Sequence, residues 1–141
     1  MANYLNYRSG LSTAGAYQVA GIPYMSASAA VIPASSGTPY QVSFPSVTKW
    51  IVVENMSTGS LRVGYSELGV KGTSENAYFV LSTPGDHNLS RIELNVRVKD
   101  IYLLADVNDT TKAQISAGLT PVSTEELTGT INNWSGSSGV G

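Results

Sequence analysis

Alternating hydrophobic and polar residues in the middle of the chain predict β-strands. The clearest case is the nine residues 91–99, where Ile92, Leu94, Val96 and Val98 alternate with charged or amide side chains. A period of two fits a strand whose faces have different surroundings, and it does not fit a helix. The other predicted strands cover residues 40–44, 50–53, 61–65, 77–81, 101–103 and 113–119, with a weaker candidate at 27–32.

Some of these segments are continuous apolar runs, among them residues 50–53 and 77–81. Residues 50–53 read Trp-Ile-Val-Val and stop at Glu54. A short continuous apolar run predicts a strand that is buried on both faces. We therefore expect Trp50 at the centre of the core, where its truncation to alanine costs roughly 3–5 kcal/mol.

Turn residues separate the predicted strands. Residues 55–59 are short enough for a hairpin loop, and Pro84-Gly85 suits a type II turn. Residues 66–76 form a longer predicted loop without a helix. Lys99-Asp100 is tighter and places Val98 and Ile101 on one face, whether the chain makes a flat hairpin or turns a corner between two sheets.

Eight short strands without a long helix predict an all-β fold. Turn signals every 8–15 residues are typical of an antiparallel β-sandwich, and eight strands favour a single jelly roll. We divide the chain into an N-terminal arm (1–35), a jelly-roll domain (36–122) and a C-terminal arm (123–141).

The two arms differ in composition from the middle of the chain. Residues 1–35 carry one charge, Arg8, and place four tyrosines among Ala, Ser and Gly, while residues 123–141 end in a Ser/Gly-rich stretch. We interpret both as extended segments that lie against neighbouring subunits of an assembly. The alternative is that they fold back on their own domain.

Charge and targeting signals exclude several functions. The 141 residues include 8 Lys and Arg against 10 Asp and Glu, a net charge of -2, so nucleic acid is not an expected partner. No run of about 18 apolar residues is present, and the N-terminus does not resemble a secretory signal. We expect no membrane insertion.

Residues for catalysis or metal binding are sparse. The single histidine, His87, lies in a predicted turn, and with no cysteine the usual His/Cys zinc sites are excluded. No Gly-x-Ser-x-Gly elbow is present, and Asp100, Asp106 and Asp109 do not have EF-hand spacing. The sequence predicts no enzyme: no catalytic residues, no cofactor and no metal site.

Two further patterns concern carbohydrate. Asn-x-Ser/Thr sequences occur at Asn55, Asn88, Asn108 and Asn133. They are relevant only in the secretory pathway, and we expect them to be unmodified. Sugars also stack on exposed aromatic rings, for which the candidates are Tyr65, Tyr78, Tyr102 and Trp134. The alternative for Tyr65 and Tyr78 is that they pack with the core.

Six segments of the middle zone resemble a known family. They are residues 47–55 (VTKWIVVEN), 59–66 (GSLRVGYS), 69–72 (GVKG), 78–81 (YFVL), 98–103 (VKDIYL) and 116–120 (SAGLT). They resemble the small single-jelly-roll vertex (penton) capsid proteins of large icosahedral DNA viruses, notably those that infect algae. The resemblance extends over roughly residues 36–122.

The resemblance implies a structural virion protein without catalytic activity. Five copies would surround each fivefold vertex of the capsid and contact the neighbouring capsid proteins, so the expected location is the virion, assembled in the host cell. The outward charged residues expected at subunit interfaces are Arg62, Glu67, Lys71, Glu93, Arg97 and Lys99, each of which is otherwise a solvated surface residue. The alternative function is a carbohydrate- or receptor-binding jelly-roll module, with a glycan as partner.

Overall fold

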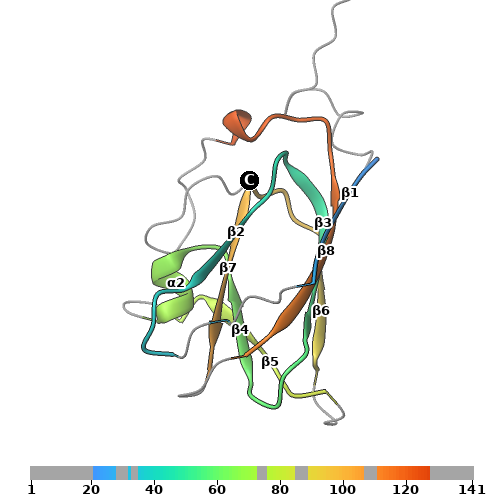
Figure 1. Cartoon of the computed structure of the whole chain (residues 1–141). Helices are drawn as coiled ribbons and strands as arrows, with labels where there is room; N and C mark the ends of the chain where they lie inside the picture. Colours follow the sequence, from blue (N-terminus) through green and yellow to red (C-terminus); the bar gives the residue numbers. More distant parts are fainter. Residues whose placement is uncertain are drawn as a thin grey trace, which may run out of the picture.

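The computed structural model describes residues 21–27, 32, 35–72, 76–84, 89–106 and 111–127. The strands are β1 (Ile22–Ala27), β2 (Tyr40–Ser43), β3 (Thr48–Asn55), β4 (Leu61–Gly64), β5 (Tyr78–Leu81), β6 (Arg91–Leu94), β7 (Asp100–Ala105) and β8 (Ala113–Leu119). They form two antiparallel sheets with the strand orders β1-β8-β3-β6 and β2-β7-β4-β5, which face each other (Figure 1). The prediction of an eight-stranded antiparallel β-sandwich is confirmed.

The core lies between the sheets and takes every second residue of most strands. In β8, Ala113, Ile115, Ala117 and Leu119 are buried while Gln114 is exposed, as the alternation at 113–119 predicted. The same inward alternation supplies buried residues from the other strands, among them Val42, Ile51, Val53, Leu61, Val63, Leu81, Leu94, Ile101 and Leu103.

The turn at Lys99-Asp100 is a corner between the sheets. β6 belongs to the first sheet and β7 to the second, and Val98 and Ile101 on either side of the turn are both fully buried. The predicted common face is therefore confirmed. The segment 91–99 is a continuous strand only as far as Leu94, and Val98 follows as a single bridge residue.

Trp50 is not in the core. In β3 the burial alternates, so that Ile51 and Val53 are fully buried while Trp50 and Val52 are partly exposed on the outer face of the β1-β8-β3-β6 sheet. The prediction of a strand buried on both faces is wrong. A continuous apolar run needs a second layer on its outer side, and none of the described residues forms one there.

The second sheet does have an outer layer. The loop predicted at 66–76 contains a short helix, α2 (Glu67–Lys71), which packs against β4 and β7 on the outside of that sheet (Figure 1). The Ser66 hydroxyl caps the helix by accepting from the Gly69 amide, and Gly72 ends it at a φ of 71°, which a glycine adopts without strain. A five-residue helix is too short to show a helical period in sequence.

Residues that we assigned to the arms take part in the sandwich. β1 lies within the predicted N-terminal arm and pairs with β8, and Ile32 is buried and bridges to Thr111. The weak strand expected at 27–32 is displaced, since the observed strand covers 22–27. At the other end, Leu127 is buried with Val47 and Val122. Residues 1–20 and 128–141 lie outside the described residues.

Two buried polar side chains fix the ends of β3. The Thr48 hydroxyl donates to the carbonyl of Val96 at 2.8 Å and accepts from the amide of Val98 at 3.1 Å, which ties β3 to the corner between the sheets. At the other end, Asn55 is fully buried and bonded to segments of both sheets. Both residues satisfy buried backbone groups that no strand partner reaches.

Candidate functional site

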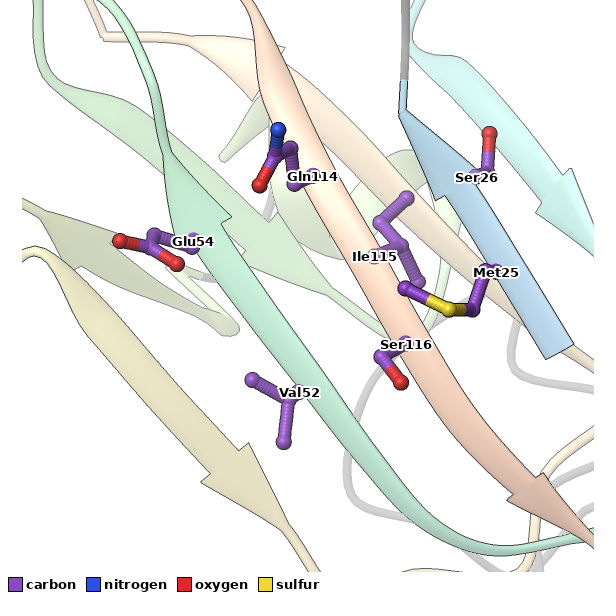
Figure 2. Close-up of a pocket in the computed structure, with 7 residues that line it drawn as sticks. All are labelled: Met25, Ser26, Val52, Glu54, Gln114, Ile115 and Ser116. Carbon is purple, nitrogen blue, oxygen red and sulfur yellow. The ribbon is translucent and has the colours of Figure 1, made fainter. Parts of the chain in front are cut away.

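The outer face of the β1-β8-β3-β6 sheet carries a hollow because its second strand bears small side chains. Ser116 of β8 lies between Met25 of β1 and Val52 of β3 in the strand register, and Gly118 lies beside Trp50. Figure 2 shows Met25 extending toward Ser116, with Val52 on the neighbouring strand. The short residues of β8 leave space that the longer side chains on either side enclose.

This hollow crosses the sheet as one trough. Its part near β1 has a volume of about 250 Å³ and is lined by Met25, Val52, Glu54, Gln114 and Ser116, among others (Figure 2). Its part near β6 has a volume of about 330 Å³ and is lined by Trp50, Val52, Arg91, Glu93 and Ser116. Val52 and Ser116 line both parts, so we treat them as a single surface, called the trough below.

A second feature is the exposure of large hydrophobic side chains at two edges of the sandwich. The β1 edge carries Ile22 and Met25, which are 45% and 79% exposed. The β5 edge carries Phe79 and Val80, which are 51% and 44% exposed. Leu89 (58% exposed) lies beside the end of β5, where its carbonyl accepts from the amide of Ser82, and we count it with this edge. Single exposed apolar residues are common on proteins, whereas clusters of them mark contact sites.

The two edges lie on opposite flanks of the molecule. β1 and β6 are the outer strands of one sheet, and β2 and β5 are the outer strands of the other. Tyr24 of β1 contacts Phe44, which follows β2, with ring centroids 5.0 Å apart, so β1 and β2 share a flank. Asn55 bonds both to Leu81 at the end of β5 and to Ser90 beside β6, which places those strands on the other flank.

Arg62, one of the six residues predicted at interfaces, is engaged within its own chain. Its Nε donates to Asp106 Oδ1 at 2.6 Å, its Nη1 donates to the carbonyls of Val70 and Lys71 at 3.3 Å, and its guanidinium lies 4.5 Å from the centroid of the Tyr78 ring. Arg62 therefore attaches α2 to the sheet. Asp106, its acidic partner, was not singled out for this role because the two residues are 44 positions apart.

The other five predicted residues are dispersed. Glu67 and Lys71 form an exposed i,i+4 ion pair of 3.1 Å on α2, and Glu93 lines the trough on the opposite sheet. Arg97 and Lys99 lie at the corner between β6 and β7, where Arg97 is exposed and Lys99 partly so. The structure does not bring the six residues into one patch.

The tyrosines considered for sugar stacking do not form a shared exposed surface. Tyr65 packs against the core, and burial raises the pKa of its hydroxyl. Tyr78 lies beneath Arg62. The pKa of Tyr102 is raised by burial and, to a lesser extent, by the negative charges of Asp100 and Glu67. Trp134 lies outside the described residues.

Among the sequons, only Asn55 is described, and its amide nitrogen is buried in hydrogen bonds to backbone carbonyls. His87, Asn88, Asn108, Asp109 and Asn133 lie outside the described residues. In the part of the chain that the structure covers, no three His, Cys, Asp or Glu side chains come together as metal ligands would. Likewise, none of the helices described there has the length and apolar character needed to cross a bilayer.

Comparisons of the chain with protein-family models, curated proteins and solved structures find no match. Its functional surfaces must therefore be interpreted from its own geometry. That geometry offers two apolar edges on opposite flanks and one trough across an outer face.

Proposed function

We propose that this chain is a structural virion protein: a single jelly roll of which five copies form a closed ring, the penton, at the fivefold vertices of an icosahedral capsid. In this proposal it acts through subunit contacts and not through catalysis. Its partners are copies of itself and the neighbouring capsid proteins, and its location is the virion, assembled in the host cell.

The strand pairing supports a jelly roll. Antiparallel pairs join β1 with β8, β2 with β7, β3 with β6 and β4 with β5, so the chain is paired as one long nested hairpin whose tip is β4-β5. Successive pairs fall in alternate sheets. A hairpin of eight strands rolled up in this way is what a jelly roll is expected to show, and it supports that topology, which is common to viral capsid and lectin domains.

The proposal of a ring rests on the pair of apolar edges. Five of the seven large hydrophobic residues that are exposed in the described part of the chain lie on the β1 edge or the β5 edge. A closed ring needs a heterologous interface, in which one patch of a subunit meets a different patch of the next. Two apolar patches on opposite flanks provide such a pair, and an isologous dimer requires only one patch.

The edge strands themselves also favour such a contact. β5 ends its sheet with two exposed apolar side chains and backbone groups that pair on one side only. An apolar sheet edge of this kind promotes association with another chain. In the ring, a neighbour covers that edge. The predicted charged residues Glu67, Lys71, Arg97 and Lys99 lie outside both apolar edges, and in this proposal they contact neighbouring capsid proteins, while Glu93 lines the trough. Arg62 contributes by holding α2 in place.

The ring predicts that a charge at either edge prevents closure. We expect the wild-type chain to form pentamers in native mass spectrometry, and Met25→Lys and Leu89→Lys each to abolish them, because a lysine ammonium is costly to bury in an apolar contact. Leu68→Lys is the matched control, since Leu68 is an exposed leucine (40%) on α2 away from both edges.

Mixing the two edge variants tests the head-to-tail arrangement directly. A Met25→Lys chain retains its β5 edge and a Leu89→Lys chain retains its β1 edge, so the mixture is expected to form heterodimers and no ring. A wild-type chain that is monomeric at its highest soluble concentration, or edge variants that still form pentamers, would contradict the proposal.

A further inference from the structure

The trough contains a large aromatic residue where solvent reaches it. Trp50 is partly exposed on the outer face of β3, beside the partly exposed Val52. The indole combines a flat apolar face with one N–H donor, so it suits ligands that are themselves both apolar and polar. The other sheet has α2 over its outer face, whereas this face has no covering layer among the described residues.

Polar side chains surround this aromatic residue in a regular arrangement set by the strand register. Glu54 lies between Gln114 and Arg91 across the sheet, and Val52 lies between Ser116 and Glu93. Arg91, Glu93 and Gln114 are exposed. No hydrogen bond or ion pair to any described residue is made by the side chains of these polar residues, which are Glu54, Arg91, Glu93 and Gln114.

These side chains match the hydrogen-bonding character of sugar hydroxyls. A hydroxyl both donates and accepts, and the trough offers carboxylates that accept, a guanidinium that donates, and an amide and a hydroxyl that do both. The apolar C–H face of a pyranose ring can stack on the indole of Trp50. An aromatic platform with a few convergent polar groups is the general composition of a small-ligand site.

The same geometry disfavours an extended peptide. β3 and β8 are interior strands of the sheet, paired on both sides, so their backbone groups are already used. A peptide that binds by adding a strand needs a free sheet edge, which the floor of the trough does not supply. The ligand must therefore be recognised by side chains alone.

The charge and the length of the trough further limit the class of ligand that it can bind. The trough contains two carboxylates, Glu54 and Glu93, against one guanidinium, Arg91, so an anionic ligand is repelled overall. It spans four strands, and three interstrand spacings of about 4.8 Å give roughly 14 Å. This length accommodates a short, uncharged oligosaccharide.

We propose that the trough is a binding site for a neutral oligosaccharide, with Trp50 as the stacking platform and Glu54, Arg91, Glu93 and Gln114 as hydrogen-bonding groups. The site is separate from the β5 edge. It shares Met25 with the β1 edge, while its proposed binding residues lie on β3, β6 and β8. It adds a recognition function to a protein whose other proposed contacts are structural.

The experiment is a glycan array that presents neutral and sialylated or sulfated oligosaccharides to the full chain, followed by calorimetric titration of the best neutral ligand. We expect neutral glycans to bind, Trp50→Ala to weaken binding at least tenfold, and Glu93→Ala to weaken it severalfold. Leu68→Ala is the control, because Leu68 is an exposed apolar residue on α2, away from the trough and from both apolar edges. Its affinity should equal that of the wild type.

Three results of the glycan experiments would overturn the proposal. These are no binding of any neutral glycan at millimolar concentration, a preference for anionic glycans, or binding that Trp50→Ala leaves unchanged in a folded variant. A peptide library whose ligands are lost on Trp50→Ala, without any glycan binding, would also reject it and assign the trough to protein recognition. Ring formation is scored separately by mass spectrometry, so failure of one proposal is distinguishable from failure of the other.

Discussion

Replacing Asn55 with alanine is expected to lower the free energy of unfolding by about 3–4 kcal/mol. Its side-chain amide donates to the carbonyls of Gly59 at 2.8 Å, Leu81 at 3.3 Å and Ser82 at 3.0 Å, sharing two hydrogens among them, and its Oδ1 accepts from the amide of Ser57 at 3.0 Å. Alanine leaves these backbone groups buried without partners. The residue also joins β3 to the end of β5 in the opposite sheet, so the loss weakens the contact between layers.

Urea titration measures this free energy, and the corresponding fall in melting temperature is about 10 °C for a domain of this size. Asn55→Asp is the informative comparison. It keeps the shape but presents a carboxylate to carbonyl oxygens in a buried site, which raises the pKa of the introduced group. A raised pKa in the folded state means that stability is retained at low pH and lost as the pH rises, the reverse of an ordinary surface aspartate. A loss below 1 kcal/mol for Asn55→Ala would show that water replaces the amide.

Leu103→Ala is expected to destabilise the fold more than Trp50→Ala. The sequence alone predicts the opposite order, because it places Trp50 at the centre of the core. Leu103 is fully buried in β7, an interior strand of the second sheet, where it lies between Tyr40 and Val63 in the register. Its truncation should cost about 3–4 kcal/mol, because it removes buried methyl groups and leaves a cavity. Trp50→Ala removes a larger side chain but leaves no cavity, so we expect a cost of about 1 kcal/mol or less.

Thermal unfolding of both variants, followed by circular dichroism to avoid the loss of indole fluorescence, provides the comparison. A Trp50→Ala protein that is destabilised as much as Leu103→Ala would mean that Trp50 packs in the core and that the outer face is covered. That result would also remove the stacking platform on which the proposed saccharide site depends.

Asn55 shows why a sequence motif does not reveal the structural role of its residues. In the sequence it is the first residue of an Asn-Met-Ser sequon and the start of a turn. A turn does lie there, since the side chain bonds to Ser57 and Gly59 in its own loop. The hairpin expected at residues 55–59 is wrong, because the loop connects β3 of one sheet to β4 of the other. Its contacts with Leu81 and Ser82, 26 and 27 positions away, follow only from how the sheets are packed.

Arg62 shows the same limit for charged residues. Its alternation with Leu61 and Val63 correctly indicated an outward side chain. Outward does not mean available to a partner, because α2 and Asp106 occupy the space over that sheet. The helix that creates this environment has five residues, and its stability comes from its caps and from packing and not from an amphipathic repeat.

Strict alternation along the chain was enough to predict β-strands and their inward faces, as in β8 and at residues 92–98, because side chains in a strand alternate between its two faces whatever surrounds it. It also fixed the common face of Val98 and Ile101. Only the folded structure shows which sheet each strand joins, and which outer face is covered by α2 and which is open. From this it follows that Trp50 lines a trough and that the apolar edges lie on opposite flanks. These properties depend on contacts between residues far apart in the chain, and a local pattern carries no information about what packs on its outer side.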